Sequence, residues 1–191
     1  MHLDGLKVAV LVTDGFEPSE LTEPMRALRE AGAEPTIVSN HDGQIKGKTD
    51  ADVADVDVTL DTARPDDYAA LLLPGGVKNP DTMRQDERGV AFVRHFADAG
   101  KPIAAICHAP WLLVEADVVR GRRVTSYPSL KTDLRNAGAE WVDEEVVVDA
   151  GIVTSRTPDD LPAFNAKMIE EFAEGIHPRA TTAVGSSARR T

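Results

Sequence analysis

Short runs dominated by apolar residues recur along the chain, and polar or turn-forming residues separate them. Apolar runs without strict polar alternation are typical of strands that are buried on both faces, as in parallel sheets. We therefore predict buried strands at residues 7–13, 34–39, 68–73 and 103–106.

Apolar residues at helical spacing occur in two of the three intervals between these strands and again after the last strand. Leu21, Met25 and Leu28 would line one face of a first helix, with Ser19 as its N-cap. Alternation of strand, helix and strand predicts a parallel sheet built from βαβ units. Further helices are expected at residues 87–99, 109–115 and 130–137, and from residue 157 onward.

Two other segments predict local antiparallel structure. Residues 40–61 carry several aspartates that alternate loosely with valines, which favours a short antiparallel insertion with an acidic, solvated face. A calcium loop is the alternative, but the aspartates do not follow the spacing of such loops. Residues 146–149 and 152–155 predict a hairpin around Ala150 and Gly151.

Together these elements predict one α/β domain over residues 1–175. Its expected architecture is a flavodoxin-like, doubly wound, mostly parallel sheet with helices on both faces. From residue 176 the sequence is rich in Ala, Thr and Ser. We therefore expect residues 176–191 to form a flexible C-terminal tail.

Composition narrows the range of partners. The 191 residues are 42% hydrophobic and 28% charged, as in soluble globular proteins. A formal net charge of −11 disfavours nucleic acid and anionic membranes, which repel an acidic surface. One cysteine cannot form an internal disulfide, and no signal peptide or apolar run of transmembrane length is present. We expect a cytoplasmic protein.

The strand predicted at residues 103–106 ends at Cys107 and His108, and a predicted helix follows. A side chain at such a corner stands clear of the sheet, and the free N–H groups of the helix favour a thiolate over a thiol. This position points to a nucleophile. A lone cysteine is also compatible with a small, buried core residue.

Three loops leave the carboxyl ends of predicted strands, which is where doubly wound sheets bind ligands. The first loop contains Glu17, the second Gly75 and Gly76, and the third Cys107 with His108. We expect the three loops to form one site. In it the glycine N–H groups would face a developing oxyanion, and His108 would move a proton.

An acid beside a thiol acts in opposite directions in its two protonation states. Ionised Glu17 would repel a thiolate and raise the pKa of Cys107, whereas protonated Glu17 would donate a hydrogen bond and lower it. We predict that Glu17 is the protonated donor to Cys107. An exposed loop carboxylate is the alternative.

Several motifs stand in the order found in one known family, and in them the chain resembles the ThiJ/PfpI superfamily. The resemblance is strongest to its intracellular protease I branch, within the class I glutamine amidotransferase-like fold, and covers about residues 6–172. The motifs include Asp14-Gly-Phe-Glu-Pro-Ser-Glu-Leu21, Leu73-Pro-Gly-Gly76, Ala105-Ile-Cys-His-Ala-Pro110, Gly121-Arg-Arg-Val-Thr-Ser-Tyr-Pro128 and Thr154-Ser-Arg-Thr-Pro-Asp-Asp-Leu161.

The resemblance implies that Cys107 is the nucleophile at a strained elbow, that Glu17 is hydrogen-bonded to it, and that His108 is catalytic. It implies a homo-oligomer, a dimer or larger, in which Asp81 acts across the interface to orient the histidine of a neighbouring subunit. Tyr127 matches a tyrosine that lines the family's pocket. No metal and no cofactor is implied.

The function implied by the resemblance is that of a stress-protective, cysteine-dependent hydrolase or lyase. Family activities include an intracellular cysteine peptidase, a glyoxalase III-type conversion of methylglyoxal to lactate, and a deglycase, so peptides or small carbonyl compounds are the expected substrates. A non-enzymatic, redox-sensing chaperone or holdase with an oxidisable Cys107 is the alternative. A glutamine amidotransferase would need a catalytic histidine late in the chain, where only His177 occurs.

Overall fold

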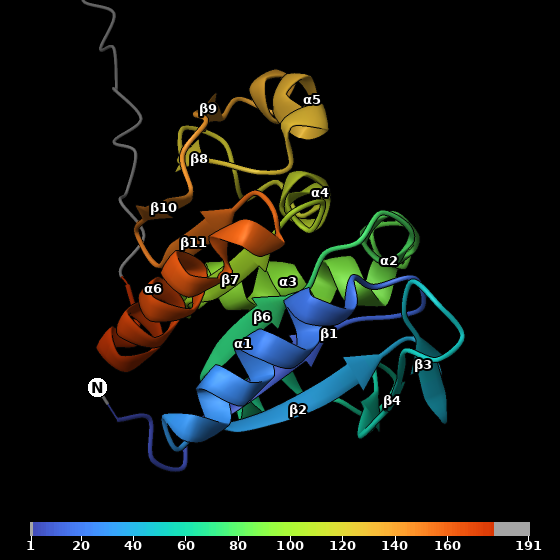
Figure 1. Cartoon of the computed structure of the whole chain (residues 1–191). Helices are drawn as coiled ribbons and strands as arrows, with labels where there is room; N and C mark the ends of the chain where they lie inside the picture. Colours follow the sequence, from blue (N-terminus) through green and yellow to red (C-terminus); the bar gives the residue numbers. More distant parts are fainter. Residues whose placement is uncertain (1, 178–191) are drawn as a thin grey trace, which may run out of the picture.

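The computed structural model describes residues 2–177, which contain a seven-stranded sheet in the order β10-β11-β7-β6-β1-β2-β5 (Figure 1). β10 runs antiparallel to β11, and the other neighbouring strands are parallel. The run β2-β1-β6-β7-β11 has the strand order of flavodoxin-like sheets, which confirms the predicted fold class. The strands are β1 (Lys7–Leu11), β2 (Glu34–Ser39), β5 (Val58–Thr59), β6 (Ala70–Leu73), β7 (Ile103–Ile106), β10 (Val146–Asp149) and β11 (Ile152–Ser155).

Helices cover both faces of this sheet (Figure 1). α1 (Pro18–Glu30) and α6 (Leu161–Glu174) pack side by side on one face. α3 (Glu87–Asp98), α4 (Pro110–Glu115) and α5 (Lys131–Asn136) contribute to the core on the other face. The short helix α2 (Lys78–Met83) follows β6 after the loop of residues 74–77.

The sheet divides the apolar core into two clusters, because alternate side chains of a strand point to opposite faces. Val8 and Val10 belong to the cluster under α1 and α6. Ala9 and Leu11 belong to the cluster under α3, α4 and α5. Burial on both faces explains why these strands are nearly continuous apolar runs in the sequence.

The predicted antiparallel insertion and hairpin are both confirmed. β3 (Gln44–Lys46) pairs antiparallel with β4 (Val53–Asp55), and β10 pairs with β11. A second small pair, β8 (Arg123–Val124) with β9 (Glu140–Trp141), is parallel. Short 3-10 turns occur at Pro65–Asp67, Pro128–Leu130 and Pro158–Asp160.

Helix α1 begins two residues earlier than it would with Ser19 as its N-cap, so the predicted cap is wrong. Pro18 is its first residue, and Glu17 takes the N-cap position with extended backbone angles. Proline suits the first helical position, since its fixed φ is already helical and its missing N–H is not needed there. Glu20, for which we predicted no role, lies in the first turn of the helix and is fully buried.

The chain beyond α6 packs against the loop that precedes β7. The His177 N–H donates to the Gly100 carbonyl at 2.8 Å, and His177 Nε2 lies 3.2 Å from Glu171 Oε2. These contacts fix the beginning of the predicted tail. Residues 178–191, the remainder of that prediction, lie outside the described residues.

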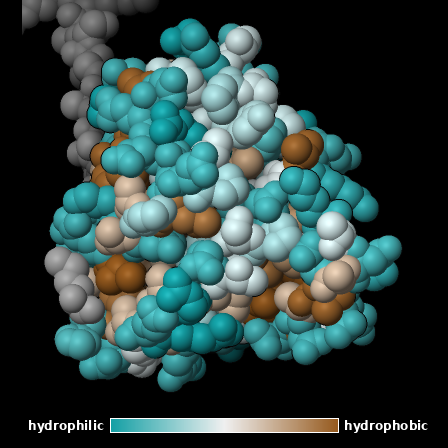
Figure 2. Space-filling model, in the orientation of Figure 1, coloured by the Kyte–Doolittle hydropathy of each residue, from teal (hydrophilic) through white to brown (hydrophobic). Residues whose placement is uncertain are grey.

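The face seen in Figure 2 is mainly hydrophilic, with apolar patches separated by polar residues. Within residues 2–177, no helix has both the length and the apolar character that a membrane crossing demands.

Candidate active site

Cys107 forms the corner between β7 and α4, and its backbone lies in the left-handed region at φ +64°. This conformation costs a non-glycine residue about 1 kcal/mol or more, so its neighbours must hold it. The Cys107 N–H donates to the Ser155 carbonyl at 3.0 Å, and the Cys107 carbonyl accepts from the Tyr127 N–H at 2.8 Å. The corner therefore has the strained backbone that the resemblance implies.

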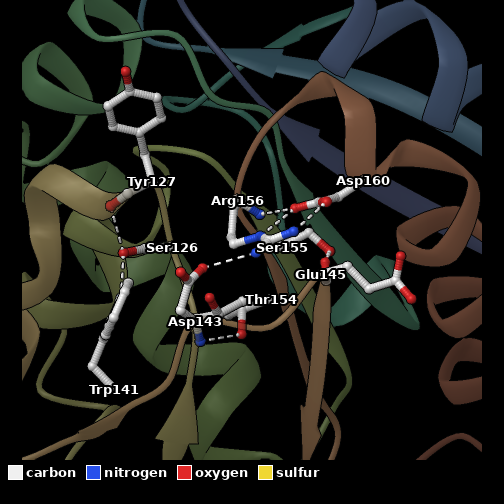
Figure 3. Close-up of polar contacts among 10 residues, drawn as sticks. Ser126, Tyr127, Trp141, Asp143, Glu145, Thr154, Ser155, Arg156 and Asp160 are labelled. Carbon is white, nitrogen blue, oxygen red and sulfur yellow. Dashed lines mark hydrogen bonds and ion pairs between the residues drawn. The ribbon is translucent and has the colours of Figure 1, made fainter.

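The two segments that clamp this elbow are themselves held by polar contacts (Figure 3). Ser155 Oγ donates to the Glu145 carbonyl at 2.6 Å. Ser126 Oγ donates to the Tyr127 carbonyl at 2.8 Å and accepts from Trp141 Nε1 at 2.9 Å. The backbone of Cys107 thus depends on segments that follow it by about twenty to fifty residues in the sequence.

The acid beside the sulfur is Glu20. Its buried carboxyl faces three groups, the Cys107 thiol and the N–H groups of Gly75 and Gly76. Neither carboxyl oxygen makes a hydrogen bond of standard geometry. The carboxyl therefore has polar neighbours, but none of them fixes its orientation through a hydrogen bond of standard geometry.

Glu17 does not contact the sulfur, so its predicted hydrogen bond to Cys107 is wrong. Its Oε2 lies 3.4 Å from Lys48 Nζ, on the wall of the same cleft. Glu17 is the N-cap residue of α1, and its side chain is 25% exposed. The missed signal was spacing: Glu20, Pro24 and Leu28 recur every fourth residue, which extends the buried stripe of α1 back to an acid.

Gly75 allows the acid and the thiol to meet. A methyl group at Gly75 would lie 2.2 Å from Glu20 Oε2, 2.6 Å from Cys107 Cβ and 2.7 Å from the Ile106 carbonyl oxygen, so no other residue fits. Gly76 follows at φ +83°, and its N–H faces both the carboxyl and the sulfur. The predicted glycine loop is therefore placed at the site.

We expect Gly75→Ala to lower the free energy of unfolding by about 3 kcal/mol, because the methyl group meets backbone and buried side chains that cannot move apart. Urea unfolding measures the loss. Gly43→Ala is the control: its methyl meets no atom within 4 Å, but its backbone has φ +80°. That variant should lose only about 1 kcal/mol. Equal losses in the two variants would contradict the steric explanation.

Burial governs the ionisation of the acid and the thiol. It raises the pKa of Glu20 from 4.5 to about 7, with a smaller contribution from the charge of Glu17. Burial, followed by repulsion from Glu20, raises the pKa of Cys107 to about 12, while the N–H groups of Gly76 and His108 act in the opposite direction. Two adjacent negative charges are costly here, so a thiolate requires a protonated Glu20.

This pKa shift predicts how stability depends on pH. Glu20 holds its proton more tightly in the folded than in the unfolded state. Its contribution to the free energy of unfolding is therefore fully present below about pH 4.5 and is lost as the pH rises to about 7. Glu20→Gln has no proton to lose. We expect the stability of wild type relative to Glu20→Gln to fall by about 3 kcal/mol between pH 4 and pH 8. Urea unfolding in a Cys107→Ser background isolates the carboxyl, and a constant difference would contradict the shift.

His108 lies between the sulfur and a hydroxyl group. Its Nδ1 is 3.1 Å from Cys107 Sγ, and its Nε2 is 3.3 Å from Ser129 Oγ. Its ring stacks on Tyr127 with the centroids 4.5 Å apart. Burial lowers the pKa of His108, so the neutral ring can accept the thiol proton at neutral pH. Tyr127 lines the cleft, in agreement with the resemblance, whereas Ser129 was not predicted.

Asp81 does not reach His108 within the chain. Its Oδ1 accepts from Arg84 Nε at 2.9 Å and from a terminal Arg84 nitrogen at 2.7 Å, and its side chain is 45% exposed. Arg84 in turn stacks on Trp111, whose ring contacts the His108 ring at 5.2 Å. Action of Asp81 across a subunit interface stays a prediction.

The site opens into a cleft of about 1000 Å³ that all three predicted loops line. Lys46, Lys48 and Lys78 add positive charge to its walls. Cavities of this size accommodate a small molecule or a short peptide segment. The three loops thus line one cleft, as expected, and Glu20 takes the place predicted for Glu17 beside the sulfur.

One group of side chains that could hold a metal ion lies away from this cleft. It consists of Glu171, Glu174 and His177, whose candidate ligand atoms lie within 4.8 Å of one another. His177 bonds to Gly100, which precedes β7, whereas Cys107 follows β7 at its other end. Among residues 2–177, no comparable group lies in the cleft.

Comparison with known proteins gives consistent matches over nearly the whole described chain. The model of the DJ-1/PfpI family matches residues 6–171. "Protein/nucleic acid deglycase 2" of Escherichia coli (strain K12) is 49% identical over 85% of this chain and 95% of its own. "General stress protein 18" of Bacillus subtilis is 47% identical over 86% and 96%, and "Putative cysteine protease YraA" of the same organism is 44% identical over 85% and 96%.

Solved structures agree with these matches. Drosophila melanogaster DJ-1beta superposes with a TM-score of 0.82 at 31% identity, over 88% of this chain and 91% of its own. A two-domain Anabaena variabilis protein with DJ-1/ThiJ/PfpI-like and ferritin-like domains superposes with a TM-score of 0.85 at 34% identity, over 88% of this chain and 48% of its own.

Proposed function

Because the chain belongs to the DJ-1/PfpI family, we propose that it is a stress-protective enzyme in which Cys107 attacks carbonyl carbon. The observation that carries this proposal is the surrounding of the sulfur: a strained elbow places it in a cleft beside Glu20, His108 and the Gly76 N–H. Similar proteins are named as deglycases, as a general stress protein and as a putative cysteine protease.

The first chemical step is the same for every carbonyl substrate. Neutral His108 takes the thiol proton, the sulfur forms a bond to the carbonyl carbon, and the carbonyl electron pair moves to oxygen. In this proposal the N–H of Gly76 and the proton of Glu20, both beside the sulfur, stabilise that oxyanion. The charge thus moves from sulfur to oxygen while the buried carboxyl stays neutral.

The later steps differ between substrates. An aldehyde gives a hemithioacetal; transfer of its C–H hydrogen to the neighbouring carbonyl carbon leaves a thioester, which water cleaves to lactate when methylglyoxal is the substrate. A peptide bond gives a thioester directly, and the amine leaves with the proton from His108. A cleft of about 1000 Å³ favours small carbonyl compounds or short extended segments over folded proteins.

We also propose a cytoplasmic homo-oligomer in which Asp81 of one subunit orients the histidine of another. The exposure of Asp81 and the position of its partner Arg84, stacked on Trp111 beside His108, support a role at an interface. A single reduced cysteine supports the cytoplasmic assignment.

The proposed function is tested with three substrates side by side: methylglyoxal, unfolded casein, and N-acetyl-lysine preincubated with methylglyoxal. Lactate release and peptide release are measured. Because Cys107 is the only cysteine, protein alkylated with iodoacetamide is a control that blocks this sulfur alone. Repair is established only if the adduct disappears faster in the presence of the enzyme than it does when free methylglyoxal alone is removed. Activity that survives alkylation, or aggregation-preventing activity alone, would exclude the cysteine enzyme and favour a holdase.

A further inference from the structure

Asn79 is a buried amide that connects two of the loops around the sulfur. It is the second residue of α2 and is 2% exposed. Its Nδ2 donates to the carbonyls of Pro74 and Gly75, each at 3.0 Å. Its Oδ1 accepts from the Thr13 N–H at 2.8 Å. The nitrogen and the oxygen of the side-chain amide therefore both have partners, and each of these bonds goes to backbone.

These bonds fix the direction in which the glycine N–H groups point. In a trans peptide unit the carbonyl and the N–H of the next residue lie in one plane and point in opposite directions. The Pro74 carbonyl shares its unit with the Gly75 N–H, and the Gly75 carbonyl shares its unit with the Gly76 N–H. Because Asn79 holds both carbonyls on its own side, both N–H groups face away from it, toward the Glu20 carboxyl.

We infer that Asn79 is a positioning residue, which aims the Gly75 and Gly76 N–H groups at the acid, the sulfur and the oxyanion of the reaction. The effect on the oxyanion rests on the proposed function, whereas the effect on the sulfur does not. Gly76 at φ +83° has access to more than one peptide orientation, so this loop needs such a restraint. The bond to Thr13 also connects the loop to the segment between β1 and α1. Glu20 lies on that helix.

The test compares Asn79→Ala and Asn79→Asp with wild type. Asp keeps the size of the side chain and the acceptor for Thr13 but lacks the two donors. Asn165→Ala is the control, because Asn165 also has a buried amide oxygen but lies on α6. Two quantities are measured: the rate of Cys107 alkylation by iodoacetamide against pH, which needs no substrate, and kcat and KM.

We expect alkylation at pH 7 to slow about tenfold or more in both Asn79 variants, with the profile shifted to higher pH, because the sulfur loses an aligned N–H. We expect kcat to fall about a hundredfold with KM within threefold. Asn165→Ala should change stability alone. Wild-type alkylation and kcat in either folded Asn79 variant would overturn the inference, and Asn79→Asp decides the question if Asn79→Ala does not fold. If wild type turns over no substrate, the alkylation profiles still decide the effect on the sulfur.

Discussion

Replacing Cys107 with serine is expected to lower turnover of each substrate about a thousandfold or more while the fold is retained. Serine is close to cysteine in size, so the elbow and its bonds to Ser155 and Tyr127 can persist. Its hydroxyl is a far weaker acid than a thiol. Burial and Glu20 raise the pKa of the thiol already, so a serine alkoxide is out of reach at this site.

Product formation by wild type and Cys107→Ser, measured at equal concentration, checks this prediction. Thermal unfolding and circular dichroism of the variant establish that it is folded. More than a tenth of the wild-type rate in folded Cys107→Ser would mean that the sulfur is not the nucleophile. Survival of aggregation-preventing activity in the same variant would show that such activity is independent of the chemistry.

The second large effect is expected when the acid beside the sulfur is removed. We expect Glu20→Leu to lower kcat/KM about a hundredfold, because leucine can neither donate to the thiolate nor supply a proton. Glu20→Gln keeps an N–H donor and should fall between wild type and Glu20→Leu. Its thiol should titrate in one step, because the coupled carboxyl is gone.

Glu17→Gln is the matched control, since it makes the same chemical change three residues earlier. Glu17 lies beside Lys48 in the cleft wall and away from the sulfur, so this variant should keep kcat/KM within about threefold of wild type. The ultraviolet absorbance of the thiolate, followed against pH, reports the sulfur in all variants. An equal loss in Glu17→Gln and Glu20→Gln would refute the assignment of Glu20.

The fold could be predicted from the sequence because the distribution of apolar residues favours a single architecture. A strand buried on both faces, such as β6, must be apolar at each position, and the runs of β1, β6 and β7 were each followed by residues at helical spacing. The carboxyl ends of β1, β6 and β7 then had to meet at one edge of the sheet. That rule alone placed the first loop, the glycine pair and Cys107 together.

The details that were missed depend on single residues at the start of helices. Glu20 is helical with either start of α1, so the sequence offered two acids three residues apart, and packing of the helix puts Glu20 on its buried face while Glu17 is the N-cap. The helix start after Cys107 suggested a low pKa for the thiol. However, α4 is only six residues long, and burial of the sulfur raises the pKa by more than the helix start lowers it. Asn79 left no trace in the sequence, because its partners are backbone groups whose directions exist only in the folded chain.

The clamp of Cys107 to Ser155 has a consequence for synthesis of the protein. While the ribosome is still making residues before β11, the corner lacks the partner that holds its left-handed backbone. A nascent polypeptide therefore carries an ordinary, unstrained thiol. The complete site forms only when the last parallel strand joins, so products that are truncated before β11 are expected to lack the proposed activity.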